Sequence, residues 1–194
     1  MKRPWSQQNK LKEKEIPSHS DIIITASNIE DLRTRSLFIL LYFTAGRASE
    51  ICCGRDKKGE VIDGIKKKDL ELTFVKGRTI LLIKTKNLKN KNRKYKYIPV
   101  PVDKEDVLLA QLNQYLGTLH PNQMLFPFAK HRAYQLIKPA TGYNPHWIRH
   151  IRLTHLIKYY NLPDQLITRF AGWTDSRPAK HYIELRWQDI VDHY

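Results

Sequence analysis

The stretch HWIRHIRLTHL, residues 146–156, places three histidines and two arginines among apolar residues. Asn144 and Pro145 precede it, and these residue types are typical of a helix cap and of the first helical turn. Five apolar side chains favour packing against a core: Trp147, Ile148, Ile151, Leu153 and Leu156. A helix with so many cationic and imidazole groups indicates a negatively charged partner beside it.

The composition points to the same kind of partner. The 194 residues include 34 Lys and Arg against 19 Asp and Glu, a formal net charge of +15, so a polyanion, first of all nucleic acid, is expected. An anionic membrane surface is the weaker alternative, because no segment combines a basic face with a long apolar one. No run of 18 apolar residues predicts a transmembrane helix, and the N-terminus lacks the apolar core of a signal peptide. Two adjacent cysteines, Cys52 and Cys53, form no disulfide framework, so an intracellular, cytoplasmic protein is expected.

The pattern of elements predicts an α+β fold that is mostly α. Residues 28–45 are expected to form an apolar helix that starts with a capping box of Ser27 and Glu30 and ends at Gly46. Residues 70–75, 78–83 and 95–102 are rich in β-branched and aromatic residues and predict a small antiparallel three-stranded sheet, with a turn at Lys76 and Gly77. Further helices are expected over 103–116, 130–138, the stretch after Asn144, 163–172 and two short terminal segments. Residues 54–64 are expected to form a charged loop.

Cationic and aromatic residues recur in a fixed order along this pattern. Arg47 lies in TAGRASEI (44–51), directly after the apolar helix. The basic connection KTKNLKNKNRK (84–94) follows, and seven Lys or Arg lie within residues 84–96. His146, Arg149 and His150 come next, then Trp173 in AGW, and nine residues later Tyr182 in HYIEL.

This ordered set resembles the tyrosine recombinase (phage integrase) family, from about residue 27 to the end of the chain. The resemblance implies that the chain is a catalytic domain that cleaves and rejoins DNA strands through a covalent 3′-phosphotyrosine, without metal, ATP or other cofactor. Arg47 and Arg149 would then bind the scissile phosphate, since each guanidinium offers a planar, permanently charged fork of donors. Tyr182 would be the nucleophile.

The remaining boxes imply supporting roles. His146 would accept a proton or donate to the phosphate, while Trp173 donates only through its indole N–H. Glu50 would orient Arg47, and His150 would support Arg149. A lysine of the basic connection would protonate the leaving 5′-oxygen: Lys89 is favoured and Lys86 is second. The other basic residues there are expected to contact DNA, namely Lys84, Lys86, Lys91, Arg93 and Lys94.

Simpler interpretations exist for single residues. His146 and His150 lie one helical turn apart and could ligate zinc, but no further ligands accompany them. His155 is expected at the surface or facing DNA, the two cysteines as small buried side chains, and Trp147 and Trp187 in the core. Tyr182 alone would be assigned to the core.

The domain organisation and the final activity stay open at this point. Residues 1–20 are expected to be a polar tail or linker remnant, and residues 21–194 the catalytic domain. The family's separate N-terminal domain, which closes a clamp around DNA, has no counterpart here, so the chain is either a minimal recombinase or a fragment. A dimer or tetramer on double-stranded DNA is expected, with the residues after Tyr182 packing in cis or in trans. The alternatives are a DNA-binding protein that keeps the fold without the reaction, and a relaxing enzyme like topoisomerase IB.

Overall fold

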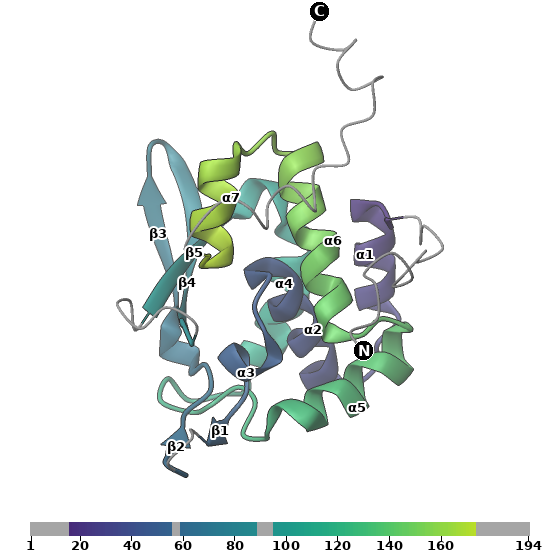
Figure 1. Ribbon diagram of the computed structural model, residues 1–194, viewed down its shortest axis with the longest axis vertical. Coiled ribbons are helices and arrows are strands. Elements are labelled where there is room, and N and C mark those ends of the chain that lie inside the picture. Colours follow the sequence, from purple (N-terminus) through teal and green to yellow (C-terminus); the bar gives the residue numbers. More distant parts are fainter. Residues whose placement is uncertain (1–15, 56–58, 89–94, 174–194) are drawn as a thin grey trace, which may run out of the picture.

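The computed structural model describes residues 16–55, 59–88 and 95–173, and all structural statements below concern these residues (Figure 1). The described helices are α1 (His19–Ser27), α2 (Leu32–Thr44), α3 (Ala48–Ile51), α4 (Asp106–Leu116), α5 (Lys130–Thr141), α6 (Pro145–Lys158) and α7 (Asp164–Ala171). The described strands are β1 (Gly54–Arg55), β2 (Val61–Ile62), β3 (Leu70–Val75), β4 (Arg78–Lys86) and β5 (Tyr95–Pro101). The mostly helical α+β class with a three-stranded antiparallel sheet is thus confirmed.

Helix α2 forms the centre of the core. Its residues from Ser36 to Thr44 are all buried, and it packs against α4, α5, α6 and β5. A helix that is apolar on every side must be covered on every side. Ala45, the first residue after α2, is buried in one cluster with Leu153 of α6 and Ile167 of α7, so the chain passes beside these two helices just before Arg47.

The sheet has the order β3–β4–β5 and lies along one side of the helices (Figure 1). The turn at Lys76 and Gly77 has positive φ angles of 50° and 77°, as the Lys-Gly pair predicts. Leu81, Ile83, Ile98 and Val100 point toward the helices and are buried. Because side chains alternate along a strand, Lys84 and Tyr97, which are paired in register, lie on the outer face.

The first helices differ from the expectation. Ser27 is the last residue of α1, and α2 starts at Leu32, where the Asp31 carboxylate accepts a hydrogen bond from the Thr34 amide at 2.9 Å. Ser18 caps α1, so this helix begins within residues 1–20, which were expected to be a polar tail. Ala45, with φ 42°, takes the left-handed position at the end of α2 that Gly46 was expected to fill.

Two further expectations about local structure were wrong. Residues 54–64 are not only a loop, because β1 and β2 pair in a short antiparallel hairpin. Strand β4 continues to Lys86, so Lys84 and Lys86 belong to the sheet and not to its connection. The helices expected around Tyr182 and Trp187 lie outside the described residues.

Candidate active site

Helix α6 begins with the cap that the sequence predicts. The Asn144 side chain accepts a hydrogen bond from the Trp147 amide at 2.8 Å, and Pro145 occupies the first turn. This fixed start sets the rotation of the helix, so that His146, Arg149 and His150 share one face through their spacing of three and four residues. His146 is exposed, His150 is half-buried, and Arg149 is only 2% exposed.

Two main-chain carbonyls orient the buried Arg149 guanidinium. Nη1 donates to the carbonyl oxygen of Ala45, at the end of α2, and Nη2 donates to that of Ala171, at the end of α7, at 3.1 Å. Both acceptors are neutral, so these bonds fix the guanidinium plane without cancelling its charge. Arg149 therefore joins the ends of two helices and keeps a positive charge between them.

Arg47 is held by a buried carboxylate that it shares with a lysine. Arg47 Nη1 lies 3.0 Å from Glu50 Oε1, and the Arg47 amide donates to Glu50 Oε2 at 3.1 Å. Lys96 Nζ forms an ion pair with Glu50 Oε2 at 3.1 Å, at angles outside those of a hydrogen bond. The expected contact between Glu50 and Arg47 is thus present, with Lys96 as an additional partner.

Burial and the neighbouring charges shift the pKa of Glu50 and that of Lys96. Burial raises the pKa of Glu50, but the charges and hydrogen bonds of Lys96 and Arg47 outweigh burial, and the carboxyl pKa is lowered overall. Burial lowers the pKa of Lys96, Glu50 opposes this, and Arg149 and Arg47 lower it further. Lys96 and Arg47 thus both stabilise the charged form of the Glu50 carboxylate.

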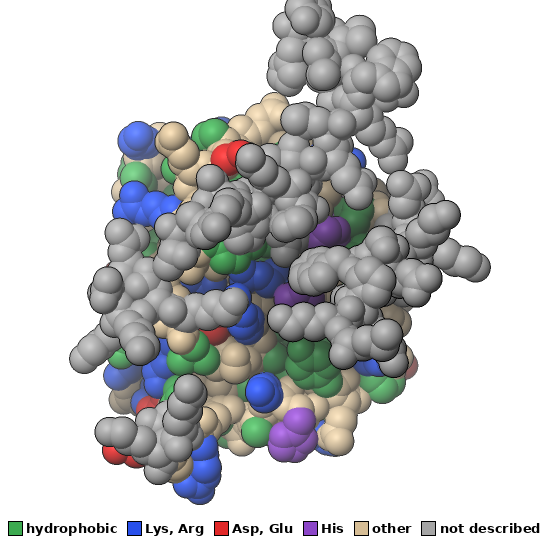
Figure 2. All heavy atoms as spheres, viewed as in Figure 1, with side chains coloured by type: hydrophobic (Ala, Val, Ile, Leu, Met, Phe, Trp, Pro, Cys, Tyr) green, Lys and Arg blue, Asp and Glu red, His purple; other side chains and the backbone are tan. Residues whose placement is uncertain are grey.

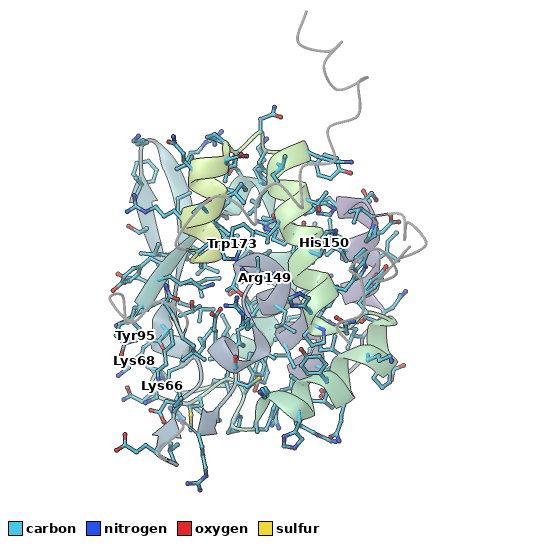
Figure 3. All side chains as sticks on the ribbon, viewed as in Figure 1. Lys66, Lys68, Tyr95, Arg149, His150 and Trp173 are labelled. Carbon is cyan, nitrogen blue, oxygen red and sulfur yellow. The ribbon has the colours of Figure 1, made fainter. Side chains whose placement is uncertain are left out.

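Trp173 lies beside the Arg149 guanidinium, and His150 follows Arg149 on α6 (Figure 3). The guanidinium carbon lies 5.6 Å from the centre of the Trp173 ring, within the range of a cation–π contact. The His150 ring stacks on Trp147 with 4.7 Å between ring centroids. Gly172, just before Trp173, comes close to Asn87, since a Cβ at Gly172 would lie 3.4 Å from the Asn87 amide nitrogen. The base of the β4–β5 connection therefore lies next to the end of α7.

Arg47, His146 and Arg149 meet at one surface hollow of about 180 Å³, which Ser49, Lys130 and Tyr134 also line. We call it the arginine hollow. Lys and Arg side chains, with His side chains beside them, gather at the centre of this face of the molecule (Figure 2). Such a hollow presents guanidinium and imidazole donors to a ligand, which is the arrangement that suits a phosphate oxygen.

Several predicted site residues do not line the arginine hollow or are not described. Lys84 and Lys86 lie on the outer face of the sheet and line a second hollow, described below. Five residues of the prediction lie outside the described part of the chain: Lys89, Lys91, Arg93, Lys94 and Tyr182. Among the described residues, no three His, Cys, Asp or Glu side chains gather as metal ligands would, and no helix is long and apolar enough to cross a bilayer.

Lys96 is the residue that the sequence reasoning missed. It lies in the strand predicted over 95–102, but it was counted only as one of the seven basic residues within 84–96 that indicate a polyanion; in β5 it is 7% exposed. A pattern in the sequence could have identified it, because Lys96, Ile98 and Val100 share one phase of the alternation in YKYIPVPV (95–102). A lysine in phase with buried residues requires a buried acid, and Glu50 is that acid.

The prediction for His155 was wrong. It is 1% exposed, its Nδ1 lies 2.8 Å from the Tyr42 hydroxyl, and its Nε2 lies 2.7 Å from the Pro17 carbonyl oxygen. Next to it, the buried Arg152 pairs with the Glu105 carboxylate, which also contacts His19 and the Tyr160 hydroxyl, both at 2.9 Å. The two arginines of α6 thus have different roles. Arg149 lines the arginine hollow, and Arg152 belongs to a buried polar network around Glu105.

The two cysteines and Trp147 also have definite places. Cys52 is buried, Cys53 is half-buried, and both are free thiols, so only Cys52 fits the expectation of a small buried side chain. Trp147 is half-buried and packs against the main core.

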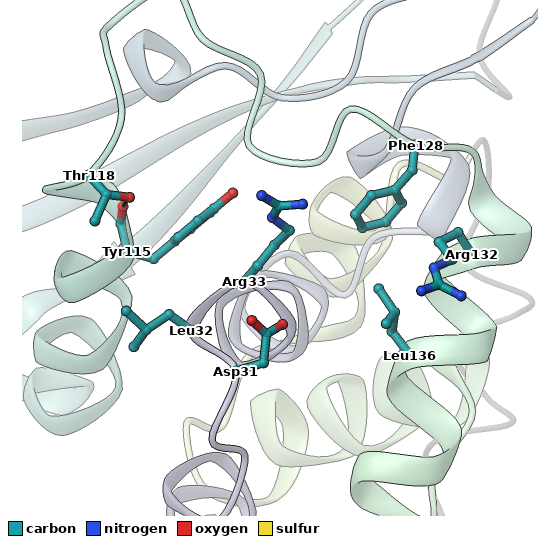
Figure 4. Close-up of a pocket in the computed structure, with 8 residues that line it drawn as sticks. All are labelled: Asp31, Leu32, Arg33, Tyr115, Thr118, Phe128, Arg132 and Leu136. Carbon is teal, nitrogen blue, oxygen red and sulfur yellow. Dashed lines mark hydrogen bonds between the residues drawn. The ribbon is translucent and has the colours of Figure 1, made fainter.

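A larger hollow, of about 390 Å³, lies between the start of α2, the end of α4 and α5 (Figure 4). Its lining includes Asp31, Arg33, Tyr115, Phe128, Arg132 and Leu136. The Asp31 carboxylate is engaged in capping α2, and no residue of the predicted site lines this hollow. Size therefore does not identify the site here, and the side-chain chemistry points to the arginine hollow.

Comparison with known proteins identifies the fold. No protein-family model matches the chain, and no curated protein matches it in sequence. Among solved structures, XerA recombinase is similar with a TM-score of 0.60 and 17% identity over 92% of this chain and 64% of that one. XerH site-specific recombinase bound to difH substrate is similar in a pre-cleavage complex, with a TM-score of 0.58 and 19% identity over 89% of this chain and 50% of that one.

A post-cleavage complex of XerH with palindromic difH substrate gives a TM-score of 0.55 and 17% identity over 95% of this chain and 54% of that one. The fold therefore resembles that of the tyrosine recombinase catalytic domain, which confirms the resemblance seen in the sequence. This chain spans between half and two thirds of the length of these recombinases.

Proposed function

We propose that the chain is a DNA strand transferase of the tyrosine recombinase type, which cleaves and rejoins DNA through a covalent 3′-phosphotyrosine. One observation carries the proposal: Arg47, His146 and Arg149, from segments a hundred residues apart, line a single hollow. Their order in the sequence and the recombinase-like fold add independent support. The partner is double-stranded DNA, on which the chain acts as a dimer or tetramer inside the cell.

The proposed chemistry needs a phosphate held in place and two proton transfers. The Tyr182 oxygen bonds to phosphorus while the bond from phosphorus to the 5′-oxygen breaks, so the energy of the phosphodiester is kept in the phosphotyrosine. Arg47 and Arg149 stabilise the charge on the non-bridging oxygens, where preorganised donors have their greatest effect. A phenol has an unperturbed pKa of about 10, so it needs a base or a cationic field, and His146 is the candidate base.

The leaving oxygen takes a proton from a lysine. Lys86 lines a different hollow from the two arginines, which leaves Lys89 as the better candidate. The close approach of Asn87 to Gly172 supports this choice, because it brings the start of the connection next to Trp173. Trp173 then acts as a hydrogen-bond donor and a packing surface, and takes no part in proton transfer.

The test is formation of a covalent protein–DNA adduct. Supercoiled plasmid is incubated with the protein to detect relaxation and to map the cleavage position. That site is then placed in a nicked duplex whose cleaved end is lost by diffusion. We expect a protein–DNA adduct that survives denaturing electrophoresis for the wild type and for Tyr159→Phe, and none for Tyr182→Phe.

Two results would contradict the proposal. An adduct that persists in Tyr182→Phe would assign the nucleophile to another residue. Wild-type protein that binds the plasmid but neither relaxes it nor becomes attached to it would favour a protein that keeps the fold for DNA binding alone.

A further inference from the structure

The outer face of the sheet carries lysines and tyrosines in an alternating arrangement. Lys84 of β4 pairs in register with Tyr97 of β5, and Lys86 pairs with Tyr95. Tyr95 is 45% exposed and Tyr97 is 57% exposed, and the Lys84 ammonium lies 4.5 Å from the centre of the Tyr95 ring. Two exposed aromatic rings thus alternate with two cations on a rigid surface.

The segment that follows β2, residues 63–69, forms a second wall. Asp63, Lys66 and Lys68 of this segment, with Lys84, Lys86 and Tyr95 of the strands, surround a hollow of about 230 Å³, which we call the sheet hollow. Lys66, Lys68 and Tyr95 lie close together at this end of the sheet (Figure 3).

A close backbone contact fixes this wall. A Cβ on Gly64 would lie 2.7 Å from the Ile51 carbonyl oxygen and 3.0 Å from the Cys52 carbonyl carbon, so only glycine fits without displacement. The Ile65 amide also donates to the Ile51 carbonyl at 2.9 Å. The segment after β2 is therefore held against α3, which carries Glu50.

The charge of the sheet hollow is positive. Lys66 is paired with Asp63 at 2.8 Å, and Asp69 accepts a hydrogen bond from the Lys66 amide, also at 2.8 Å. Within the described ranges, Lys68, Lys84 and Lys86 have no carboxylate within the 4.0 Å of an ion pair. Four lysines thus line the hollow with three carboxylates, those of Glu50, Asp63 and Asp69, and this excess of positive charge favours an anionic ligand.

A surface on which lysines alternate with exposed aromatic rings favours anions that also carry a flat ring. A phosphate backbone pairs with the lysines, and an unstacked base finds a ring face, whereas the bases of an intact duplex are stacked on each other. We propose that the sheet hollow binds unpaired nucleotides of a DNA strand next to the cleavage site, with Tyr95 as the stacking platform.

The position of the sheet hollow beside the arginine hollow supports this assignment, which rests on the proposed function. Glu50 lines the sheet hollow, while its carboxylate pairs with Arg47, which lines the arginine hollow. The Arg47–Glu50 ion pair thus lies between the two hollows. A DNA strand with one phosphate in the arginine hollow can extend past this pair to the sheet hollow. Cleavage frees a strand end that must leave its partner before it is joined elsewhere, so unpaired nucleotides arise at this place.

The experiment measures DNA affinity in the Tyr182→Phe chain, where no covalent adduct can form through that tyrosine. Fluorescence anisotropy compares a labelled duplex with the same duplex carrying a short gap of unpaired thymines. We expect tighter binding to the gapped DNA. Tyr95→Leu should weaken binding to gapped DNA by about 5- to 150-fold, since stacking contributes about 1–3 kcal/mol per base, and should leave duplex binding unchanged.

The controls separate stacking from charge and from folding. Tyr95→Phe keeps the ring and should bind as the parent does, as should Tyr159→Leu, which changes an exposed tyrosine just after α6. The double variant Lys68→Gln, Lys86→Gln should make the plot of log affinity against log salt concentration less steep. The slope should fall by about 0.7–0.9 for each lysine removed. A parent chain without preference for gapped DNA, or equal losses of Tyr95→Leu on both probes, would overturn the inference. Because only binding is measured, absence of a covalent adduct in the wild type would reject the proposed function and not this result.

Discussion

Two arginines of α6 show how the partner of a single residue determines its role. Arg149 and Arg152 are one turn apart and both fully buried, yet one is bonded to neutral carbonyls and the other to the Glu105 carboxylate. The sequence predicted the role of Arg149 through its place in an ordered set of boxes. It did not predict that of Arg152, because the partner Glu105 is distant in the chain and stands in a different helix.

Lys96 tests whether the shared carboxylate matters. Lys96→Met leaves Glu50 buried with Arg47 as its remaining ion-pair partner in the described part of the chain. We expect the free energy of unfolding to fall, but by less than the ~3–5 kcal/mol lost when a buried charge keeps no partner, because Arg47 still pairs with Glu50. We also expect slower adduct formation at saturating DNA, because Glu50 then neutralises Arg47 more fully. Chemical denaturation and single-turnover cleavage measure the two effects.

The control is the double variant Lys96→Met with Glu50→Gln. It removes both charges and should recover much of the stability lost by Lys96→Met, whereas Lys104→Met, at a site outside both hollows, should change little. Full stability in Lys96→Met alone would show that the contact of Lys96 with Glu50 contributes nothing.

His155 makes stability depend on pH. Burial lowers its pKa from 6.5 to about 4; the hydrogen bond to Pro17 opposes this, and the charge of Arg152 adds to it. Between pH 6.5 and 4 the unfolded chain binds a proton that the folded chain does not, so the free energy of unfolding falls as the pH falls. His155→Gln should make this fall shallower between pH 6.5 and 4.5, measured by urea denaturation.

The measured range stops at pH 4.5 so that protonation of Glu105 does not contribute to the slope. The pKa of Glu105 is lowered despite burial, through His19 and Arg152, so its own contribution is lost only below its unfolded value of about 4.5. An unchanged slope in His155→Gln above pH 4.5 would mean that His155 is not the residue that takes up the proton.

Among the elements, those with explicit start and stop residues were predicted best. Asn144 and Pro145 start α6, Gly172 ends α7, and Lys76 with Gly77 connects β3 to β4, all as the sequence indicates. The boundary before α2 was missed because Ser27 and Glu30 also fit a capping box, and only packing of α1 favours the start at Asp31. The extent of β4 was missed because lysines seldom indicate a strand.

The variant Gly64→Ala tests whether the segment after β2, which lines the sheet hollow, is held against α3. Gly64→Ala adds a methyl group that clashes with backbone atoms of Ile51 and Cys52. We expect the free energy of unfolding to fall by about 1–3 kcal/mol, as at other overpacked sites. Binding to gapped DNA should weaken with it if the segment is displaced. Gly54→Ala is the matched control, since nothing lies within 4 Å of its added Cβ. Equal melting temperatures for the two variants would contradict the close contact.

At the scale of the whole molecule, the fold brings together residues that the chain keeps far apart. Arg47 lies near α6 because Ala45, two residues before it, is buried in one cluster with Leu153 of α6 and Ile167 of α7. The order of the sequence boxes predicted which residues meet, but it gave no distances, and it missed Lys96 and the sheet hollow. Both depend on which face of a strand is covered, which only the packing of α3 and the β1–β2 hairpin settles.

The net charge of +15 predicts a strong effect of salt on DNA binding. A protein that contacts about 6–10 phosphates loses about 10³–10⁵ in affinity between 50 and 200 mM salt. We expect a loss of this order for a duplex that contains the cleavage site, measured by anisotropy at several salt concentrations. Affinity that is constant over this range would mean that the basic face in Figure 2 is not the DNA-binding surface.

The most direct test of the arginine hollow changes the charge of the phosphate itself. Adduct formation is measured on the mapped site with either a normal scissile phosphodiester or a neutral methylphosphonate, for the wild type, Arg47→Ala and the control Arg132→Ala. We predict that Arg47→Ala slows attachment to the phosphodiester by about 10²–10³-fold, as when one transition-state donor is removed, and slows attachment to the methylphosphonate far less. An equal loss on both substrates, or no loss on either, would contradict a site in which Arg47 stabilises the charge of the scissile phosphate.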